Sequence, residues 1–157
     1  MKNNKVKKLL NDAIKEDQKS ISEGDLEKTK LIFKKNTQLL KSIIKKNGWP
    51  SIVEGSRSFH NAWLIAQHSD HDPFFQLQCL GLVLPDIKKD KEIMVDCSFL
   101  IDRILTNLGH EQIFGTQLMG KLKKPSTFSP KQLDLLRNEI GLESIESYIK
   151  MMKKQSR

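Results

Sequence analysis

The sequence predicts a mainly α-helical fold, and three observations lead to that prediction. Apolar residues recur at helical spacing along most of the chain. Residues typical of helix caps precede these segments, and glycines follow several of them. With 157 residues, the chain can bury a core without disulfides or a structural metal. We therefore expect a compact helical domain of about six helices, with a short β-hairpin near residues 112–127.

The first part of the chain predicts a basic helical arm. Apolar residues from Val6 onwards mark a first helix, and the polar segment 22–25 ends it. Asp25 is placed to cap a second helix, which ends near Gly48. We expect this N-terminal arm, residues 1–46, to pack on the same domain as the helical core, residues 47–157, which carries the candidate site.

The positive charge of the chain is concentrated in that arm. Residues 1–46 contain 13 lysines and 6 acidic residues, which gives +7 of the total net charge of +8. Residues 47–157 contain 14 basic and 13 acidic residues and are almost neutral. A basic arm can meet phosphate or an acidic membrane surface, but solvated lysines on ordinary helices explain it as well. Aromatic residues do not alternate with the lysines as base stacking requires, so nucleic acid is not the expected partner.

Three helices are predicted in the middle of the chain. The first spans about residues 56–68. The second spans residues 73–84, with Asp72 as its N-cap and a proline at its first position. The third spans about residues 90–108, carries one broad apolar face and stops before Gly109, a residue suited to a left-handed helix end.

The helical pattern is interrupted after that glycine and then returns. Residues 112–127 contain strand-forming residues around Gly115, and they predict the hairpin. Ser129, followed by proline and then by Gln132 at the third helical position, is typical of a capping box. Two short amphipathic helices follow, separated at Gly141.

A run of polar residues from His60 to Gln76 marks the candidate site. It flanks the apolar stretch 62–66, and a helix that is apolar on all sides is normally buried. Polar groups beside such a helix need partners or a function. His68 can act as a general acid or base if Asp70 or Asp72 orients its ring. We expect these three residues to be catalytic.

Further polar residues are expected to bind the substrate. A guanidinium such as that of Arg103 can form two parallel hydrogen bonds to a phosphate or carboxylate. Asp102 lies at the edge of the apolar face of its helix, where a side chain can be half-buried and still face a cleft. The expected substrate-binding residues are Gln67, Gln76, Asp102, Arg103, Thr116 and Gln117.

We expect neither a metal nor a cofactor. His68, Asp70, His71 and Asp72 offer donors within five residues, but their spacing matches neither a His-Glu-x-x-His nor a paired-cysteine site. The chain has no phosphate loop, dinucleotide-binding fingerprint or glycine-flanked serine elbow.

The cysteines and the amino terminus indicate a cytosolic protein. Cys79 and Cys97 fall in apolar helical patterns, so we expect reduced thiols in the core. The amino terminus lacks the apolar stretch of a signal peptide, and no segment is long enough to span a membrane.

Several short motifs follow one another along the chain. They are Gly48-Trp-Pro-Ser51, Ala62-Trp-Leu-Ile65, the run Gln67–Gln76, Asp102-Arg103, Gln112–Gln117 and Gly141-Leu-Glu-Ser144. Together they resemble a bacterial domain-of-unknown-function family, number six-six-two-four, over roughly residues 48–149. The resemblance implies no established activity, although it favours the same candidate site residues. His60 and His71 lie outside the family pattern, and Phe114 stands where the family has tyrosine.

These observations favour a small cytosolic hydrolase that acts on a small polar substrate, such as one bearing a phosphate or a ribose, through histidine and aspartate acid–base chemistry. The alternative is a non-catalytic module that binds a protein or a small ligand through the same polar cleft, aided by the basic arm. A third interpretation is that the polar residues form one buried structural network. The sequence does not indicate an oligomeric state.

Overall fold

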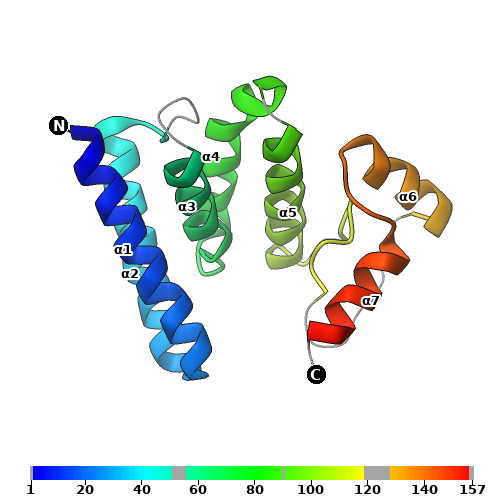
Figure 1. Ribbon diagram of the computed structural model, residues 1–157, viewed down its shortest axis with the longest axis horizontal. Coiled ribbons are helices and arrows are strands. Elements are labelled where there is room, and N and C mark those ends of the chain that lie inside the picture. Colours follow the sequence, from blue (N-terminus) through cyan, green and yellow to red (C-terminus); the bar gives the residue numbers. More distant parts are fainter. Residues whose placement is uncertain (1, 51–55, 90, 119–127, 156–157) are drawn as a thin grey trace. The chain divides into compact units, whose positions relative to one another are not determined.

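A computed structural model describes residues 2–50, 56–89, 91–118 and 128–155. This part of the chain contains seven α-helices, one 3-10 helix and no strand, which confirms the prediction of a mainly helical fold (Figure 1). The elements are α1 (Lys2–Glu23), α2 (Leu26–Asn47), α3 (Ser56–Gln67), α4 (Pro73–Val83), η2 (Leu84–Lys89), α5 (Lys91–Asn107), α6 (Pro130–Glu139) and α7 (Ile145–Gln155). The chain divides into two compact units, residues 1–82 and 83–157.

The first unit is built on a pair of long helices, α1 and α2, which lie side by side (Figure 1). The turn between them contains Gly24 at φ 72° and Asp25, whose side chain accepts the backbone N–H of Lys28 and caps α2 as predicted. Helices α3 and α4 complete the unit. Its core consists of Leu10, Ala13, Leu40, Ile43, Ala62, Ile65, Ala66, Phe75 and Cys79.

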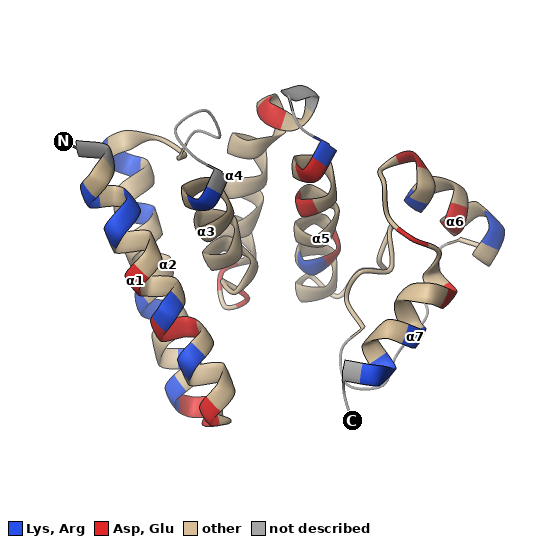
Figure 2. Ribbon diagram, viewed as in Figure 1, with Lys and Arg blue, Asp and Glu red and all other residues tan. Residues whose placement is uncertain are grey.

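The lysines of α1 and α2 lie on the outer faces of these two helices (Figure 2). They are exposed wherever their side chains are described, except for the half-buried Lys41. Lys35 pairs with Glu16 across the two helices at 2.8 Å, but an exposed pair of this kind contributes little stability. None of the helices in the described ranges combines the length and the apolar character needed to cross a bilayer.

The second unit contains η2, α5, α6 and α7. Helix α5 ends before Gly109, which adopts φ 78° as the sequence predicted. Ser129 and Gln132 form the predicted capping box at the start of α6. A separate apolar cluster joins the carboxyl-terminal helices, and its buried members are Leu118, Leu133, Ile145 and Tyr148.

The hairpin that the sequence predicted near residues 112–127 is not supported. Residues 112–118 form no strand, and residues 119–127 lie outside the described part of the chain. The physical reason is that the backbone N–H groups of Ile113, Phe114 and Thr116 donate to the side chain of Asp102. Amides that are bound to a carboxylate cannot pair with a neighbouring strand.

The chain turns sharply after α2. The N–H of Gly48 donates to Ile44 O at 2.9 Å and closes the helix, while the glycine itself adopts φ 77° and ψ −174°. That combination is essentially restricted to glycine. The turn directs Trp49 onto the core, where its ring meets Phe59 edge-on at 6.0 Å between centroids.

We predict that Gly48→Ala lowers the free energy of unfolding by about 1–3 kcal/mol, because alanine is strained in that backbone conformation. Gly81→Ala is the matched control, since Gly81 is an exposed residue of α4 with open space around its Cα. Alanine is the better helix former, so this variant should gain roughly 0.5–1 kcal/mol. Urea unfolding of both variants measures the two changes, and equal effects at the two positions would contradict the prediction.

Candidate functional site

His68 pairs with a carboxylate that is distant in the sequence. It follows the last residue of α3, and its Nδ1 lies 2.7 Å from Oδ2 of Asp17 in α1. Phe33 of α2 stacks on the imidazole, with 4.6 Å between ring centroids and 20° between planes. Two neighbouring helices therefore hold the ring, one by a hydrogen bond and one by stacking.

Sequence reasoning missed Asp17 because it searched for partners near His68 in the chain. The residue pattern of α1 nevertheless points to Asp17. The buried residues of this helix follow one another at helical spacing and end in two polar positions: Leu10, Ala13, Asp17 and Ser20. A carboxylate on the buried face of a helix needs a partner, and this one meets the imidazole.

The pair combines a buried carboxylate with a partly accessible imidazole. The side chain of Asp17 is 1% exposed and that of His68 is 16% exposed. Oδ1 of Asp17 is buried and has no hydrogen-bond partner in the described part of the chain. The described residues also provide no hydrogen-bond partner for Nε2 of His68. The ring is thus fixed at one nitrogen, and the described residues do not use the other.

Asp72 caps α4 as the sequence predicted. Its Oδ1 accepts the N–H of Phe75 at 3.0 Å, and its Oδ2 lies 2.6 Å from Nζ of Lys41. The Lys41 hydrogen bond, together with that backbone donor, holds the pKa of Asp72 below its ordinary value of 3.8. Asp70 has a different partner, because its Oδ1 accepts from Gln76 Nε2 at 3.3 Å. The two carboxylates expected beside His68 therefore bind other groups.

Gln76 joins the end of α3 to α4. Its fully buried amide donates to Ala66 O at 3.1 Å and to Gln67 O at 3.2 Å. The last carbonyls of a helix have no partner within the helix, so this amide satisfies two of them. Gln67 is itself buried, with 6% of its surface exposed. The arrangement fixes the segment that leads into His68.

In the second unit, Asp102 is fully buried and accepts four hydrogen bonds. Oδ1 accepts from the N–H groups of Ile113 and Phe114 at 2.8 and 3.0 Å. Oδ2 accepts from the N–H of Thr116 at 2.8 Å and from its hydroxyl at 2.9 Å. A carboxylate has about four acceptor positions, so these four hydrogen bonds occupy all of them. Asp102 thereby shapes the segment between α5 and α6.

The other expected substrate-binding residues of this unit meet in the same segment. Nη1 of Arg103 donates to Oε1 of Gln117 at 3.1 Å. Gln112 pairs reciprocally with the backbone of Gln117, at 2.7 and 2.9 Å. The candidate residues thus form two groups, one in each unit, with Gln67, His68, Asp70, Asp72 and Gln76 in the first and Asp102, Arg103, Thr116 and Gln117 in the second.

Arg137 is a buried charged residue that sequence reasoning did not single out. Only 1% of its surface is exposed. Its Nε donates to Glu143 O at 2.7 Å, its Nη1 donates to Phe114 O, and its guanidinium lies 5.1 Å from the ring centre of Tyr148. Burial lowers the pKa of Arg137 and raises that of Tyr148, whose hydroxyl donates to Thr116 O. These contacts hold α6 and α7 to the segment shaped by Asp102.

The cysteines are buried, and the histidines other than His68 are exposed. Burial raises the pKa values of Cys79 and Cys97 to about 12, so these free thiols stay protonated at neutral pH. His60 and His71 are exposed. Within the described residues, no group of three or more His, Cys, Asp or Glu side chains is arranged to hold a metal ion.

Comparison with known proteins gives a family but no activity. The family model described as "Family of unknown function (DUF6624)" matches residues 13–156, a range that includes Asp17, Phe33 and His68. Neither the curated proteins nor the solved structures contain a match to this chain.

We predict that Asp102→Asn destabilises the protein by about 2 kcal/mol or more, because an amide nitrogen would face two donors and leave them unsatisfied. Thr116→Val removes only one of the four hydrogen bonds to Asp102, and Gln117 Nε2, which also donates to the Thr116 hydroxyl, keeps Phe99 O as an acceptor, so this variant should cost about 1 kcal/mol. Chemical denaturation gives both values. A loss for Thr116→Val as large as that for Asp102→Asn would show that the carboxylate does not organise the segment.

The cap at Asp72 predicts a pH-dependent stability. The folded pKa of this carboxyl lies below its ordinary value, so its contribution is complete above about pH 4 and is lost as the pH falls through the folded pKa. Asp72→Ala should cost about 1 kcal/mol near neutral pH. Asp72→Asn keeps a capping side chain, so it isolates the charge. The stability difference between wild type and Asp72→Asn should vanish below the folded pKa, and a difference independent of pH would contradict the assignment.

Proposed function

The chain belongs to the DUF6624 family, whose function is unknown, and we propose from its own site that it is a small hydrolase in which His68 transfers protons and Asp17 orients His68. The observation that carries the proposal is the 2.7 Å hydrogen bond between His68 Nδ1 and Asp17 Oδ2. A carboxylate at Nδ1 favours the tautomer with its proton on that nitrogen. Nε2 then carries the lone pair and can accept a proton from a substrate or a water.

Burial of the carboxylate supports a role beyond packing. Within the described ranges, one carboxylate oxygen of Asp17 is hydrogen-bonded and the other is not, and a buried acceptor without a partner reduces stability. A purely structural position would be served as well by an apolar residue that fills the same space. A carboxylate beside an imidazole has a chemical use, because it stabilises the imidazolium that forms when Nε2 takes a proton.

Stacking on Phe33 supports the same conclusion. A general base is effective when its ring is already held in a productive orientation, because the ring then loses no rotational freedom when the substrate binds. Here the hydrogen bond fixes the edge of the ring and Phe33 fixes its face. The remaining exposure of His68 leaves access to the ring.

The proposed reaction uses water as the nucleophile. Among the described residues, no hydroxyl or thiol is hydrogen-bonded to His68, so the geometry offers no serine or cysteine nucleophile. Nε2 removes a proton from water while the water oxygen forms a bond to the carbonyl carbon or phosphorus of the substrate. The same proton then passes from Nε2 to the leaving group as its bond to that centre breaks.

We also propose a class of substrate and a cellular compartment for the enzyme. We propose a small polar substrate, such as a phosphate- or ribose-bearing compound. The Gln67 amide can donate to a phosphate oxygen, and the Asp70 carboxylate, two residues after His68, can accept from a ribose hydroxyl. Asp70 and Asp72 support this segment rather than the proton transfer itself. The free thiols of Cys79 and Cys97 suit a reducing compartment, and we place the enzyme in the cytosol.

Hydrolysis of p-nitrophenyl phosphate, bis(p-nitrophenyl) phosphate, p-nitrophenyl acetate and a nucleoside panel tests the proposal. For the substrate that wild type cleaves, His68→Gln should lower kcat by roughly 100-fold or more and abolish the pH dependence that the imidazole imposes. Asp17→Asn should lower kcat with little change in KM. His71→Gln is the matched control, because His71 is an exposed histidine three residues away, and it should keep full activity.

Two results would overturn the proposal. One is a wild-type protein that cleaves none of these compounds. The other is a His68→Gln variant that keeps its activity while its melting temperature falls, which would make the His68–Asp17 pair a structural clamp between α1 and the end of α3.

A further inference from the structure

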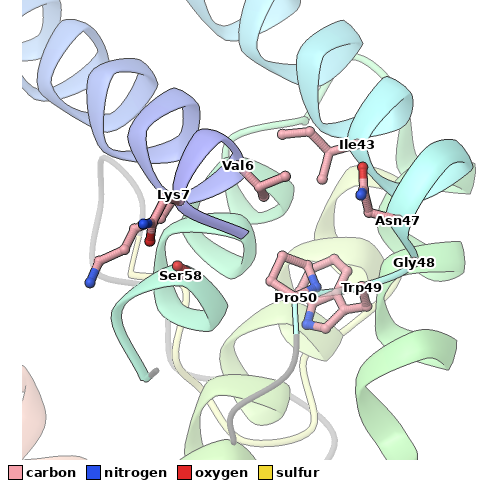
Figure 3. A pocket seen from close by; sticks show the side chains of 9 residues that line it. Val6, Lys7, Ile43, Asn47, Gly48, Trp49, Pro50 and Ser58 are labelled. Atoms are coloured by element: carbon pink, nitrogen blue, oxygen red, sulfur yellow. The ribbon is translucent and has the colours of Figure 1, made fainter. Parts of the chain in front are cut away.

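A pocket in the first unit lies at the end where α1 begins and α2 ends. It has a volume of about 160 Å³ and shares no residue with the His68–Asp17 pair. Its lining consists of Asn4, Val6, Lys7, Ile43, Asn47, Gly48, Trp49, Pro50 and Ser58. Figure 3 shows the Trp49 and Pro50 rings facing Val6 and Ile43, with Asn47 at one side and with Lys7 and Ser58 at the other.

Trp49 contributes a polar atom that has no partner. Its indole Nε1 is buried, and no group in the described part of the chain accepts its hydrogen. Buried tryptophan N–H groups usually find an acceptor, since a buried donor without one reduces stability. Because this nitrogen is buried, an acceptor bound in the pocket reaches it only when the groups that cover it move. The unsatisfied N–H therefore indicates a ligand that brings an acceptor.

The charges around the pocket favour an anionic acceptor. Its described lining contains Lys7 and no Asp or Glu. An adjoining pocket shares Val6, Ile43 and Asn47 with it and adds Lys5 and Lys46. The amino end of α1 and the carboxyl end of α2 meet here, so their opposite dipoles offset each other and the lysines set the local sign.

Size and lining restrict the rest of the ligand. A cavity of about 150 Å³ accommodates one benzene molecule. The apolar side chains Val6, Ile43 and Pro50 suit a ring or a branched chain of that size. From these observations we propose that the pocket binds a small organic anion, with its apolar part against these residues and an oxygen of its carboxylate or phosphate accepting the Trp49 N–H.

Titration of the full-length 15N-labelled protein tests this proposal through its two indole N–H resonances, those of Trp49 and Trp63. The probes are benzoate, phenyl phosphate and the neutral benzyl alcohol. At least one anion should shift the Trp49 resonance saturably and leave that of Trp63 in place, whereas benzyl alcohol should bind at least about tenfold more weakly. The tighter anion identifies the head group as a carboxylate or a phosphate.

Two substitutions separate the contributions. Trp49→Phe keeps an aromatic ring but removes the N–H, and it should weaken anion binding by about tenfold or more. Lys7→Met changes an exposed residue outside the core. It should weaken binding of the anions by a few-fold and leave binding of benzyl alcohol unchanged. Backbone amide shifts of the lining residues report binding in both variants, because Trp49→Phe lacks the indole resonance, and melting temperatures verify that both variants fold.

Three results would overturn the proposal. Neither anion shifts the Trp49 resonance at millimolar concentration, which would mean that the pocket holds water only. Benzyl alcohol binds as tightly as the anions. A folded Trp49→Phe variant binds them as tightly as wild type does.

Discussion

A carboxylate that is buried away from water must accept hydrogen bonds from protein groups instead, and this requirement organises both units of the protein. In the described part of each unit one aspartate is fully buried, Asp17 in the first and Asp102 in the second. Around Asp102 the backbone itself supplies the donors, and the segment after α5 takes its shape from them. Around Asp17 the donor is the imidazole of His68, which ties the end of α3 to α1. The helices supply the apolar cores, but these two carboxylates determine how the connecting segments meet them.

The two aspartates differ in how completely they are satisfied, and that difference carries the functional argument. Among the described residues, Asp102 accepts four hydrogen bonds, whereas the side chain of Asp17 accepts one and leaves its other oxygen without a partner. A saturated carboxylate has no capacity left for a ligand or a proton. A carboxylate beside a partly exposed imidazole can orient the ring and stabilise the imidazolium that forms when the ring acts as a general base. Of the two groups of candidate residues, the one around His68 is therefore the one on which the proposed function rests.

The structure also shows how the N-terminal arm, residues 1–46, contributes to the first unit. The sequence showed its lysines and its apolar repeats but not how the two would divide between solvent and core. In the structure α1 and α2 contribute Leu10, Ala13, Leu40 and Ile43 to the core of the first unit, while most of their lysines face outwards. The same helices supply Asp17 and Phe33 to the candidate site. The arm thus forms part of the scaffold that positions His68.

Local signals in the sequence determined the helices and their ends. Apolar spacing, the caps at Asp25, Asp72 and Ser129, and the left-handed Gly109 depend on residues within one or two turns, so each could be read directly. His68 could be singled out for the same reason, as a polar residue beside a buried helix. Its partner could not, because 51 residues separate it from Asp17 and only packing of α3 against α1 brings them together. The strand-forming residues after Gly109 led to the wrong prediction of a hairpin, because their backbone N–H groups donate to Asp102, which lies in α5. Periodicity and capping are properties of neighbouring residues, whereas the partner of a buried charge is decided by tertiary structure alone.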